Sequence, residues 1–267
     1  MKGAQLKISN AIEEMCRVIF ALILREIKSR FGNQRLGYIW AILEPVLFVV
    51  VLSIVFSLRG RYSPQGLGLE LFLVTGVVPY FLFRHIMAAS VRALTANRQL
   101  LTYPQVQMND IIFARALLEF ATSVVVFVVI LTLIHLIKID RVAIDFPLGV
   151  LAGFFMMALF GLGLGLILSS LFPIFPSVQP MSEALLGRPL FFTSGAFFSA
   201  EIMPEKAREI LLWNPLFHVI EYIRGAFFPG IESLYFDPQY TLTFMIVLLF
   251  MGLLMQRALH RYALSLT

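Results

Sequence analysis

Long runs of apolar residues, separated by short polar segments, dominate the pattern of the chain. A helix needs roughly 20 apolar residues to cross about 30 Å of hydrocarbon, and six runs approach this length. The fifth run is interrupted by Arg188-Pro189 and by Ser194-Gly195. We therefore predict an all-α integral membrane protein with six transmembrane helices, at about residues 39–58, 69–89, 111–137, 146–171, 182–198 and 240–259.

The segment before the first run mixes basic and apolar residues. Over residues 11–31, charged side chains are scattered among apolar ones, a mixture typical of a helix that lies flat on a membrane surface beside anionic headgroups. Gly32-Asn33 then supplies a turn. Residues 1–36 are therefore predicted to form an N-terminal amphipathic interface helix.

The distribution of basic residues predicts how the chain is oriented. The first 36 residues hold seven Lys and Arg, and none of the predicted outside loops holds more than three. Because cytoplasmic segments of membrane proteins carry an excess of Lys and Arg, we expect both termini to be cytoplasmic. The same bias explains the net charge of +5, so nucleic-acid binding is not predicted.

The segment at 200–229 is too polar for a span and too apolar for an ordinary loop. Pro204 is followed by Glu205, as in a first helical turn, and Asn214-Pro215 supplies an N-cap with proline at the first helical position. These signals predict two short helices. Each holds about 10 to 14 residues, which favours a re-entrant pair over a spanning helix.

The second of these short helices carries polar residues at three-residue spacing. His218, Glu221 and Arg224 fall on one stripe, with apolar residues on the opposite side. The stripe has two interpretations. It lines a polar exit, or it is a solvated face with a Glu221–Arg224 pair.

Composition excludes most other classes of protein. The chain is 59% hydrophobic and 14% charged, far from the usage of soluble globular proteins. A single membrane domain over 1–267 is expected. Cys16 is the only cysteine, so neither an intrachain disulfide nor a cysteine-cluster metal site is possible, and no metal site is predicted.

The sequence lacks the nucleotide-binding, catalytic and channel-filter motifs that can be recognised in a single chain. There is no G-x-x-x-x-G-K-[ST] phosphate loop, so the chain is not expected to bind ATP in the P-loop manner. A membrane enzyme of lipid-linked sugar assembly remains an alternative, although no H-E-x-x-H motif, nucleophile elbow or close acidic pair supports it. A passive channel would need a filter motif that the chain lacks. The run Gly161-Leu162-Gly163-Leu164-Gly165 is interpreted as a site of close helix packing.

Three stretches resemble a known family. LREIKSRF, LGYIWAILEP and SGAFFSAEIMPEKAREILLWNPLFHVIEYIRGAFF look like the permease (transmembrane) subunit of a type-2 ABC exporter, of the capsular polysaccharide export branch (KpsM-type). The resemblance covers nearly the whole chain. In the third stretch, the motif that resembles the superfamily consists of Ser194, Gly195, Pro204, Asn214, Pro215, His218, Glu221 and Arg224.

The resemblance implies a transport subunit and not an enzyme. It implies ATP-driven export of lipid-linked capsular polysaccharide by a homodimer in the bacterial inner membrane. Two separate ATPase subunits at the cytoplasmic face would use ATP and Mg, and this chain would bind no cofactor. A periplasmic adaptor of the polysaccharide co-polymerase or auxiliary type is implied as a further partner. An O-antigen, teichoic acid or small-molecule exporter of the same superfamily is the alternative.

The resemblance and the intramembrane charges together give the candidate site residues. Ionisable groups at membrane depth usually face protein or water. Side chains of opposite charge on different spans are expected to form pairs. Each charged residue is therefore either part of a substrate pathway or a structural link between helices. Residues 200–229 would form the outward gate. The candidates are Arg25, Lys28, Arg98, Tyr103 and Pro104 for ATPase contact; Arg30, Tyr38, Trp40, Glu44, Arg84 and Arg188 for the substrate pathway; and Trp213, His218, Glu221, Tyr222 and Arg224 for the gate.

Overall fold

The computed structural model describes a helical protein. It covers residues 17–28, 36–58, 67–97, 106–137, 139, 142–231 and 233–266, and within these ranges it contains helices and turns but no strand. Five helices are long and apolar enough to cross a membrane. The prediction of an all-α membrane protein is confirmed at this level.

The five long helices begin and end close to the predicted apolar runs. Their lengths of 23 to 29 residues suit the hydrocarbon thickness of a bilayer. Their bounds are α2 Leu36–Leu58, α3 Leu69–Val91, α5 Met108–Leu136, α6 Pro147–Leu171 and α11 Pro238–Leu266. Proline at the first helical position starts α6, and α6 ends shortly before Pro173.

The fifth apolar run folds differently from the long helices. It forms α7 Val178–Met181, the π-helix η3 Ser182–Gly187 and α8 Arg188–Thr193 in succession. The helical segment therefore covers 178–193, whereas the sequence predicts 182–198. Pro189 lacks the N–H that an uninterrupted α-helix would use, and a π turn precedes it. The helix ends where Gly195 adopts a φ of 76°.

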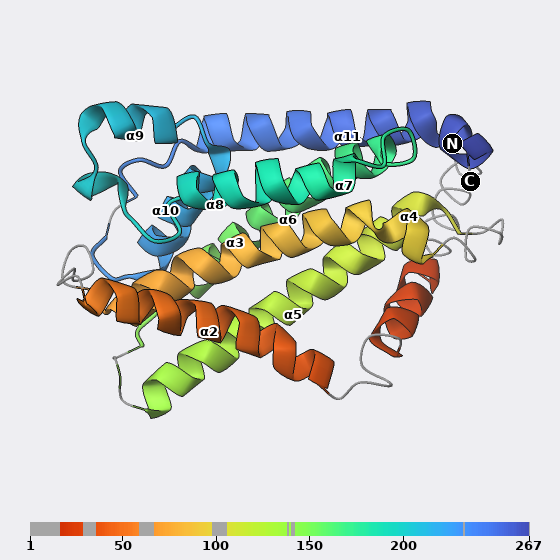
Figure 1. The fold of residues 1–267 in the computed structure, drawn as a ribbon. Coiled ribbons are helices and arrows are strands. Elements are labelled where there is room, and N and C mark those ends of the chain that lie inside the picture. Colours follow the sequence, from red (N-terminus) through yellow and green to blue (C-terminus); the bar gives the residue numbers. More distant parts are fainter. Residues whose placement is uncertain are drawn as a thin grey trace, which may run out of the picture.

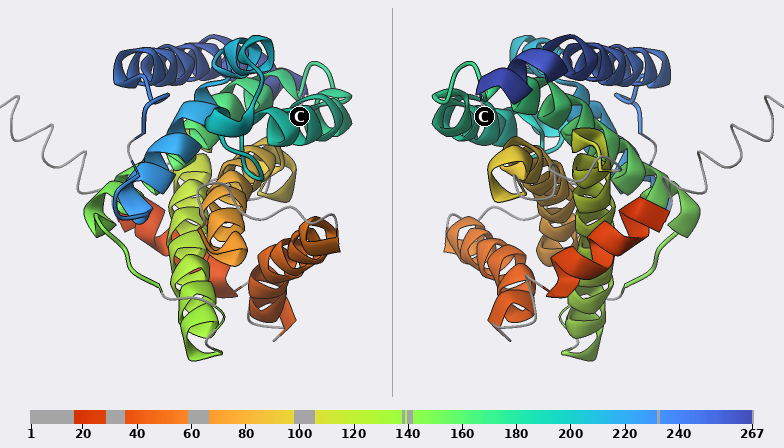
Figure 2. Two further views of the ribbon diagram at one scale, coloured as in Figure 1. Left: turned by 90° about the vertical axis from the view of Figure 1, so that its left-hand side faces the viewer. Right: turned by 90° about the vertical axis from the view of Figure 1, so that its right-hand side faces the viewer.

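Helix α3 forms the centre of the fold. In its apolar part 83% of the residues are buried, against 11% for α2 and 17% for α11. It packs against α6 most extensively, and also against α5, α2 and α10. Figure 1 shows α2 and α11 on opposite sides of the bundle, and Figure 2 shows α3 between them. Helices α2 and α11 are thus the least buried of the five long helices.

Glycines allow α6 to approach its neighbours closely. A Cβ at Gly161 would lie 2.7 Å from the carbonyl oxygen of Phe83 in α3, and one at Gly165 would lie 2.6 Å from Ser90 in the same helix. A Cβ at Gly163 would lie 3.0 Å from Leu248 in α11. The interpretation of these glycines as helix-packing positions is supported, because larger residues would separate the backbones.

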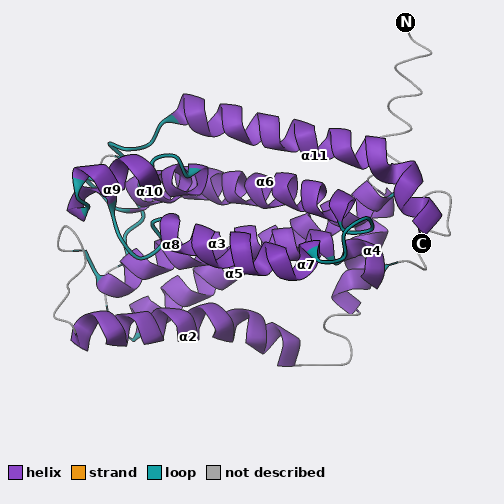
Figure 3. Cartoon of the chain, turned by 45° about the horizontal axis from the view of Figure 1, so that its top comes forward, coloured by secondary structure: helices purple, strands orange, loops and turns teal. Residues whose placement is uncertain are grey.

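The two ends of the bundle differ in what they carry. The helix at residues 17–28, α4 Ala93–Ala96 and the C-terminal end of α11 lie at one end (Figure 1). At the other end lie η4 Ala200–Ile202, α9 Glu205–Leu211 and α10 Pro215–Phe227 (Figure 3). Two short α-helices are present over 200–229 as predicted, but α9 has 7 residues and not the 10 to 14 expected, because the 3-10 helix η4 and Pro204 precede it. The Asn214 side chain caps α10 by accepting a hydrogen bond from the Leu216 N–H at 3.0 Å.

Substituting Gly161 by leucine should weaken the packing of α6 on α3. The added side chain meets the α3 backbone, which cannot move aside as a flexible side chain can, so we expect a loss of about 1–3 kcal/mol in unfolding free energy. The measurement is the unfolding midpoint of the purified chain in mixed detergent micelles. Leu151→Phe adds volume at an exposed position of α6 and should leave the midpoint unchanged. Equal effects of the two substitutions would contradict the packing role.

Candidate functional site

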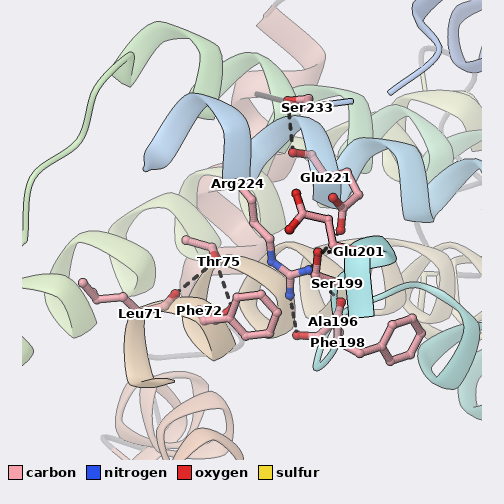
Figure 4. A network of polar contacts seen from close by, with 10 residues as sticks. All are labelled: Leu71, Phe72, Thr75, Ala196, Phe198, Ser199, Glu201, Glu221, Arg224 and Ser233. Atoms are coloured by element: carbon pink, nitrogen blue, oxygen red, sulfur yellow. Dashed lines mark hydrogen bonds and ion pairs between the residues drawn. The ribbon is translucent and has the colours of Figure 1, made fainter. Parts of the chain in front are cut away.

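A buried arginine organises the end of the bundle that carries α9 and α10. Arg224 of α10 is 4% exposed. Its Nη1 donates a hydrogen bond to the carbonyl oxygen of Phe198 at 2.9 Å, and its Nη2 donates to that of Ala196 at 3.0 Å. Nη1 also lies 3.4 Å from Oε1 of Glu221, one turn earlier in α10 (Figure 4). Arg224 thus binds the carbonyl groups of the turn that follows α8.

Helix α3 supplies the other wall of the Arg224 site. The guanidinium carbon lies 3.8 Å from the ring centroid of Phe72, a cation–π contact. Thr75, one turn further along α3, is fully buried and donates to the carbonyl oxygens of Leu71 and Phe72 (Figure 4). One side chain therefore joins α10, α3 and the 196–198 turn.

Burial changes the acid–base properties of the Arg224–Glu221 pair, which lies outside the five candidate spans. Desolvation raises the pKa of Glu221, and the neighbouring Arg224 charge acts in the opposite direction. Desolvation lowers the pKa of Arg224 to about 10, and Glu221 partly offsets this. Arg224 therefore keeps its charge at neutral pH. Nε of Arg224 is buried without a hydrogen-bond partner among the described residues.

His218 fixes the loop that leads into α11. Its Nδ1 accepts a hydrogen bond from the backbone N–H of Asp237 at 3.1 Å. Because a backbone N–H only donates, Nδ1 is unprotonated, and Nε2 carries the proton that it donates to the carbonyl oxygen of Leu212 at 2.8 Å. His218 is therefore in its neutral Nε2–H form.

The polar stripe of α10 is buried and not solvated. His218, Glu221 and Arg224 are 4%, 8% and 4% exposed, so the interpretation of the stripe as a solvated face is wrong. The reason is that the loops after α8 and before α11 cover it and use its hydrogen-bonding capacity. Of the other gate candidates, Trp213 is 80% exposed, and Tyr222 packs against Phe236 with ring centroids 4.8 Å apart.

A second charged cluster joins α2 to α3. Oε1 of Glu44 pairs with Nη2 of Arg84 at 2.5 Å, and Oε2 lies 3.5 Å from Nε2 of His85. The Arg84 and Glu44 side chains are 38% and 30% exposed, and the Arg84 guanidinium also lies over the Phe81 ring. The expected pairing of opposite charges on different spans is confirmed for this pair.

Two further substrate-pathway candidates lie on the bundle surface. Trp40, four residues before Glu44 in α2, is 63% exposed, and the α-helical repeat places it on the same face as Glu44. Arg188 begins α8 and is exposed. Tyr80 of α3 donates a hydrogen bond to the carbonyl oxygen of the adjacent Gly187. Arg30 lies outside the described residues, as does the side chain of Tyr38.

Side chains of the helix at residues 17–28 contact the segment that follows α3 and the first half of α5. Arg25 donates a hydrogen bond to Asn97 Oδ1 at 3.1 Å. Glu26 forms an ion pair with Arg115 of α5 at 3.2 Å, and Arg115 also donates to the carbonyl oxygen of Ala89. Lys28 is exposed. The remaining ATPase-contact candidates, Arg98, Tyr103 and Pro104, lie outside the described residues.

Sequence reasoning missed several partners in these clusters. Phe72 and Asn97 contact the candidate residues Arg224 and Arg25, but no pattern in a single sequence links positions 72 or 97 to positions 224 or 25. Asn97 has a weak signal, because a polar residue just after an apolar run often binds a neighbouring element. Among the described residues, no three His, Cys, Asp or Glu side chains gather to hold a metal ion.

Replacing Arg224 by methionine should destabilise the end of the bundle that carries α9 and α10. The change leaves the Glu221 carboxylate and two carbonyl oxygens buried without their donor, which costs about 3–5 kcal/mol for a broken buried pair. The unfolding midpoint in mixed micelles measures the effect. Arg208→Met, at a partly exposed arginine of α9, should cost less than about 1 kcal/mol. A similar loss in both variants would contradict the role given to Arg224.

Comparison with known proteins gives the chain its family. The model of the family described as ABC-2 type transporter matches residues 17–228. The chain is 36% identical to polysialic acid transport protein KpsM of Escherichia coli over 237 residues, which cover 89% of this chain and 91% of that protein.

Two further relatives are similar over most of their length. Capsule polysaccharide export inner-membrane protein CtrC of Neisseria meningitidis serogroup A is 32% identical over 240 residues, covering 89% of each chain. Capsule polysaccharide export inner-membrane protein BexB of Haemophilus influenzae is 32% identical over 247 residues, covering 90% of this chain and 89% of BexB. The chain therefore belongs to the ABC-2 type transporter family of membrane proteins.

Proposed function

We propose that the chain is the membrane-spanning subunit of an ATP-driven exporter that moves lipid-linked capsular polysaccharide across the bacterial inner membrane. The observation that carries the proposal is its likeness, over about nine tenths of its length, to proteins named for capsule polysaccharide export. The five apolar helices agree with a transport subunit embedded in the membrane. ATP and Mg would be used by a separate ATPase, and this chain would bind no cofactor.

The proposed topology has six spans within one transmembrane domain, residues 1–267. The α7–η3–α8 segment would be the fifth span, and α9 with α10 would form a re-entrant pair on the outer side. Support comes from the position of helix 17–28 and the end of α11 at one end of the bundle (Figure 1). The seven basic residues of the first 36 favour the cytoplasm for that end.

The ATPase pair would dock at the end that carries helix 17–28 and α4. The contacts of Arg25 with Asn97 and of Glu26 with Arg115 attach this helix to α3–α4 and α5. A displacement of the helix would therefore be transmitted into the central helix of the fold. The predicted contact residues Arg98, Tyr103 and Pro104 follow α4 directly in the sequence.

The outer pair would act as a gate that moves with α3. Glu221 and Arg224 fix α10 to the 196–198 turn, and Arg224 also lies against Phe72 of α3. Because these groups are buried and hydrogen-bonded, α10 and α3 are expected to move together. Trp213, His218 and Tyr222 would belong to the same gate.

The substrate would enter beside α2 and α8. Glu44, Arg84 and Arg188 are the charged candidates, and Tyr38, Trp40 and Arg30 would complete the pathway. The half-exposed Arg84 suits the phosphate or acidic sugars of a lipid-linked polymer, because arginine donates paired hydrogen bonds to such groups. Two copies of the chain would enclose the pathway as a homodimer, with a periplasmic adaptor of the polysaccharide co-polymerase or auxiliary type on the outer side.

An O-antigen, teichoic acid or small-molecule cargo is the alternative within the same superfamily. Family membership argues against the alternative of a membrane enzyme of lipid-linked sugar assembly, since the matched family and the relatives reported above are described as transport or export proteins.

Deleting the gene in its host should trap intact lipid-linked polysaccharide inside the cell. The polymer is still made, but its route across the inner membrane is missing. The measurement is fractionation of the polysaccharide into surface and intracellular pools, with a complemented strain as control and copurification of an ATPase as a second readout. Loss of all polymer would indicate synthesis instead, and an unchanged surface pool would indicate a different cargo.

A charge exchange at Glu44 and Arg84 should separate a substrate contact from a structural link. Arg84→Glu places two carboxylates together and should lower export roughly tenfold, equivalent to about 1.4 kcal/mol. If Arg84 contacts the substrate, adding Glu44→Arg restores stability but not export. Recovery of export in the double variant would assign the pair a structural role only. The exposed pair Arg92–Glu183, exchanged in the same way, is the control.

A further inference from the structure

An open cleft lies beside α9 at the end of the bundle opposite helix 17–28. It has a volume of about 430 Å³ and is formed by α9, the start of α10, the 234–237 loop and the first turn of α11. Glu205, Lys206 and Glu209 of α9 are exposed, which favours water for the side of the helix that carries them. A second hollow of about 450 Å³ shares Asp237 and Tyr240 with the cleft.

Four aromatic side chains line the cleft, and two of them, Tyr235 and Tyr240, are held by other contacts. Tyr235 receives a hydrogen bond on its hydroxyl from Arg208 at 3.1 Å, and the Arg208 guanidinium lies 5.1 Å from its ring centroid. Tyr240 donates to the backbone carbonyl of Trp213 at 2.6 Å and packs against His218. The Tyr235 and Tyr240 rings are therefore in place before a ligand arrives, which lowers the entropic cost of binding.

Several polar groups of the cleft retain unused hydrogen-bonding capacity. Within the described part of the chain, no hydrogen bond or ion pair engages the Glu209 carboxylate or the indole N–H of Trp213. Asp237 uses Oδ1 to accept from the Tyr240 N–H, which leaves Oδ2 open. The cleft thus offers aromatic faces together with carboxylate acceptors. Aromatic faces pack on the C–H surfaces of sugar rings, and carboxylates accept hydrogen bonds from sugar hydroxyls.

The charge of the cleft selects among sugars. Glu209 and Asp237 are both acidic, and His218 at its floor is in the neutral form given by its two hydrogen bonds. Arg208 supports the outer side of Tyr235. A carboxylated sugar would bring a like charge towards two carboxylates, which is unfavourable. An uncharged sugar with free hydroxyls meets no such penalty.

We propose that this cleft, lined by Glu209, Trp213, Tyr235, Asp237 and Tyr240, is a carbohydrate subsite that takes uncharged sugar units of the polymer as it leaves the permease. The proposal rests on the proposed function in polysaccharide export. It adds a second contact with the polymer, separate from the Glu44–Arg84 cluster. It also adds a preference for uncharged over acidic units.

The two tryptophans of the chain make the subsite directly measurable. Trp40 and Trp213 are the only ones in the sequence, so Trp40→Phe leaves a single indole in the cleft. The full-length chain, in lipid nanodiscs, is titrated with maltotetraose as a neutral probe and with tetragalacturonate as an acidic one, and the fluorescence is recorded. Trp213→Phe, which keeps only Trp40, is the control for effects outside the cleft.

Saturable quenching of Trp213 by maltotetraose, with at least about tenfold weaker quenching by tetragalacturonate, is the expected result. Glu209→Gln should reduce the difference between maltotetraose and tetragalacturonate in the quenching of Trp213. Glu205→Gln, one turn away and outside the cleft lining, should leave that difference unchanged. No saturable change with either sugar would overturn the proposal and leave Trp213 as an interface anchor. Tighter binding of a tetralysine peptide would also overturn it, in favour of a basic protein segment.

The outcome is independent of the proposed function as a whole. If the chain supports polysaccharide export but does not bind the sugars, the subsite proposal is wrong and the proposed function stands. If the chain binds the sugars but its deletion leaves the surface polymer unchanged, the subsite proposal stands and the proposed capsular cargo is wrong. Export by Glu209→Gln, compared with Glu205→Gln in the complemented host, connects the two measurements.

Discussion

The structure depends on how backbone carbonyl groups are satisfied where a helix breaks inside an apolar bundle. After α8 the chain turns at Gly195, and the carbonyl groups of Ala196 and Phe198 no longer have helical partners. An unsatisfied backbone group in an apolar setting costs several kcal/mol. Arg224 donates to both carbonyl groups while Glu221 offsets its charge. This interaction allows a tight turn, and hence the whole α9–α10 pair, to rest on α3.

Helix α3 connects nearly every feature described above. Phe72 lies under Arg224 near its first turn, Tyr80 binds the carbonyl of Gly187, and Arg84 pairs with α2. Asn97, just beyond its end, binds Arg25. The close approach of α6 at Gly161 holds the helix in place along its length. Direct contacts therefore follow α3 from its first turn to the segment beyond its end.

Sequence patterns predicted the long helices well because apolar runs of spanning length have few alternatives in a membrane. The caps at Pro204 and Asn214 were also readable, since their chemistry is local. The burial of His218, Glu221 and Arg224 could not be predicted. Their three-residue spacing shows that they share one face of the helix, but it does not show which segments cover that face. The partners come from residues 196–198, 212 and 237, and only the folded chain brings these together. The end of the fifth helix was misplaced for the same reason.

The π-helix between α7 and α8 has a geometric consequence for the fifth helical segment. A π turn holds one residue more than an α turn, and the next turns of the helix are displaced accordingly. Moving this extra residue along the chain through α8 would rotate the residues that it passes by about 100° about the helix axis, with little change in length. Arg188 and Phe192, both exposed at α8, would then point in other directions. Such a shift would change the side chains that α8 presents at its surface, while the helix on either side of the passed residues kept its register.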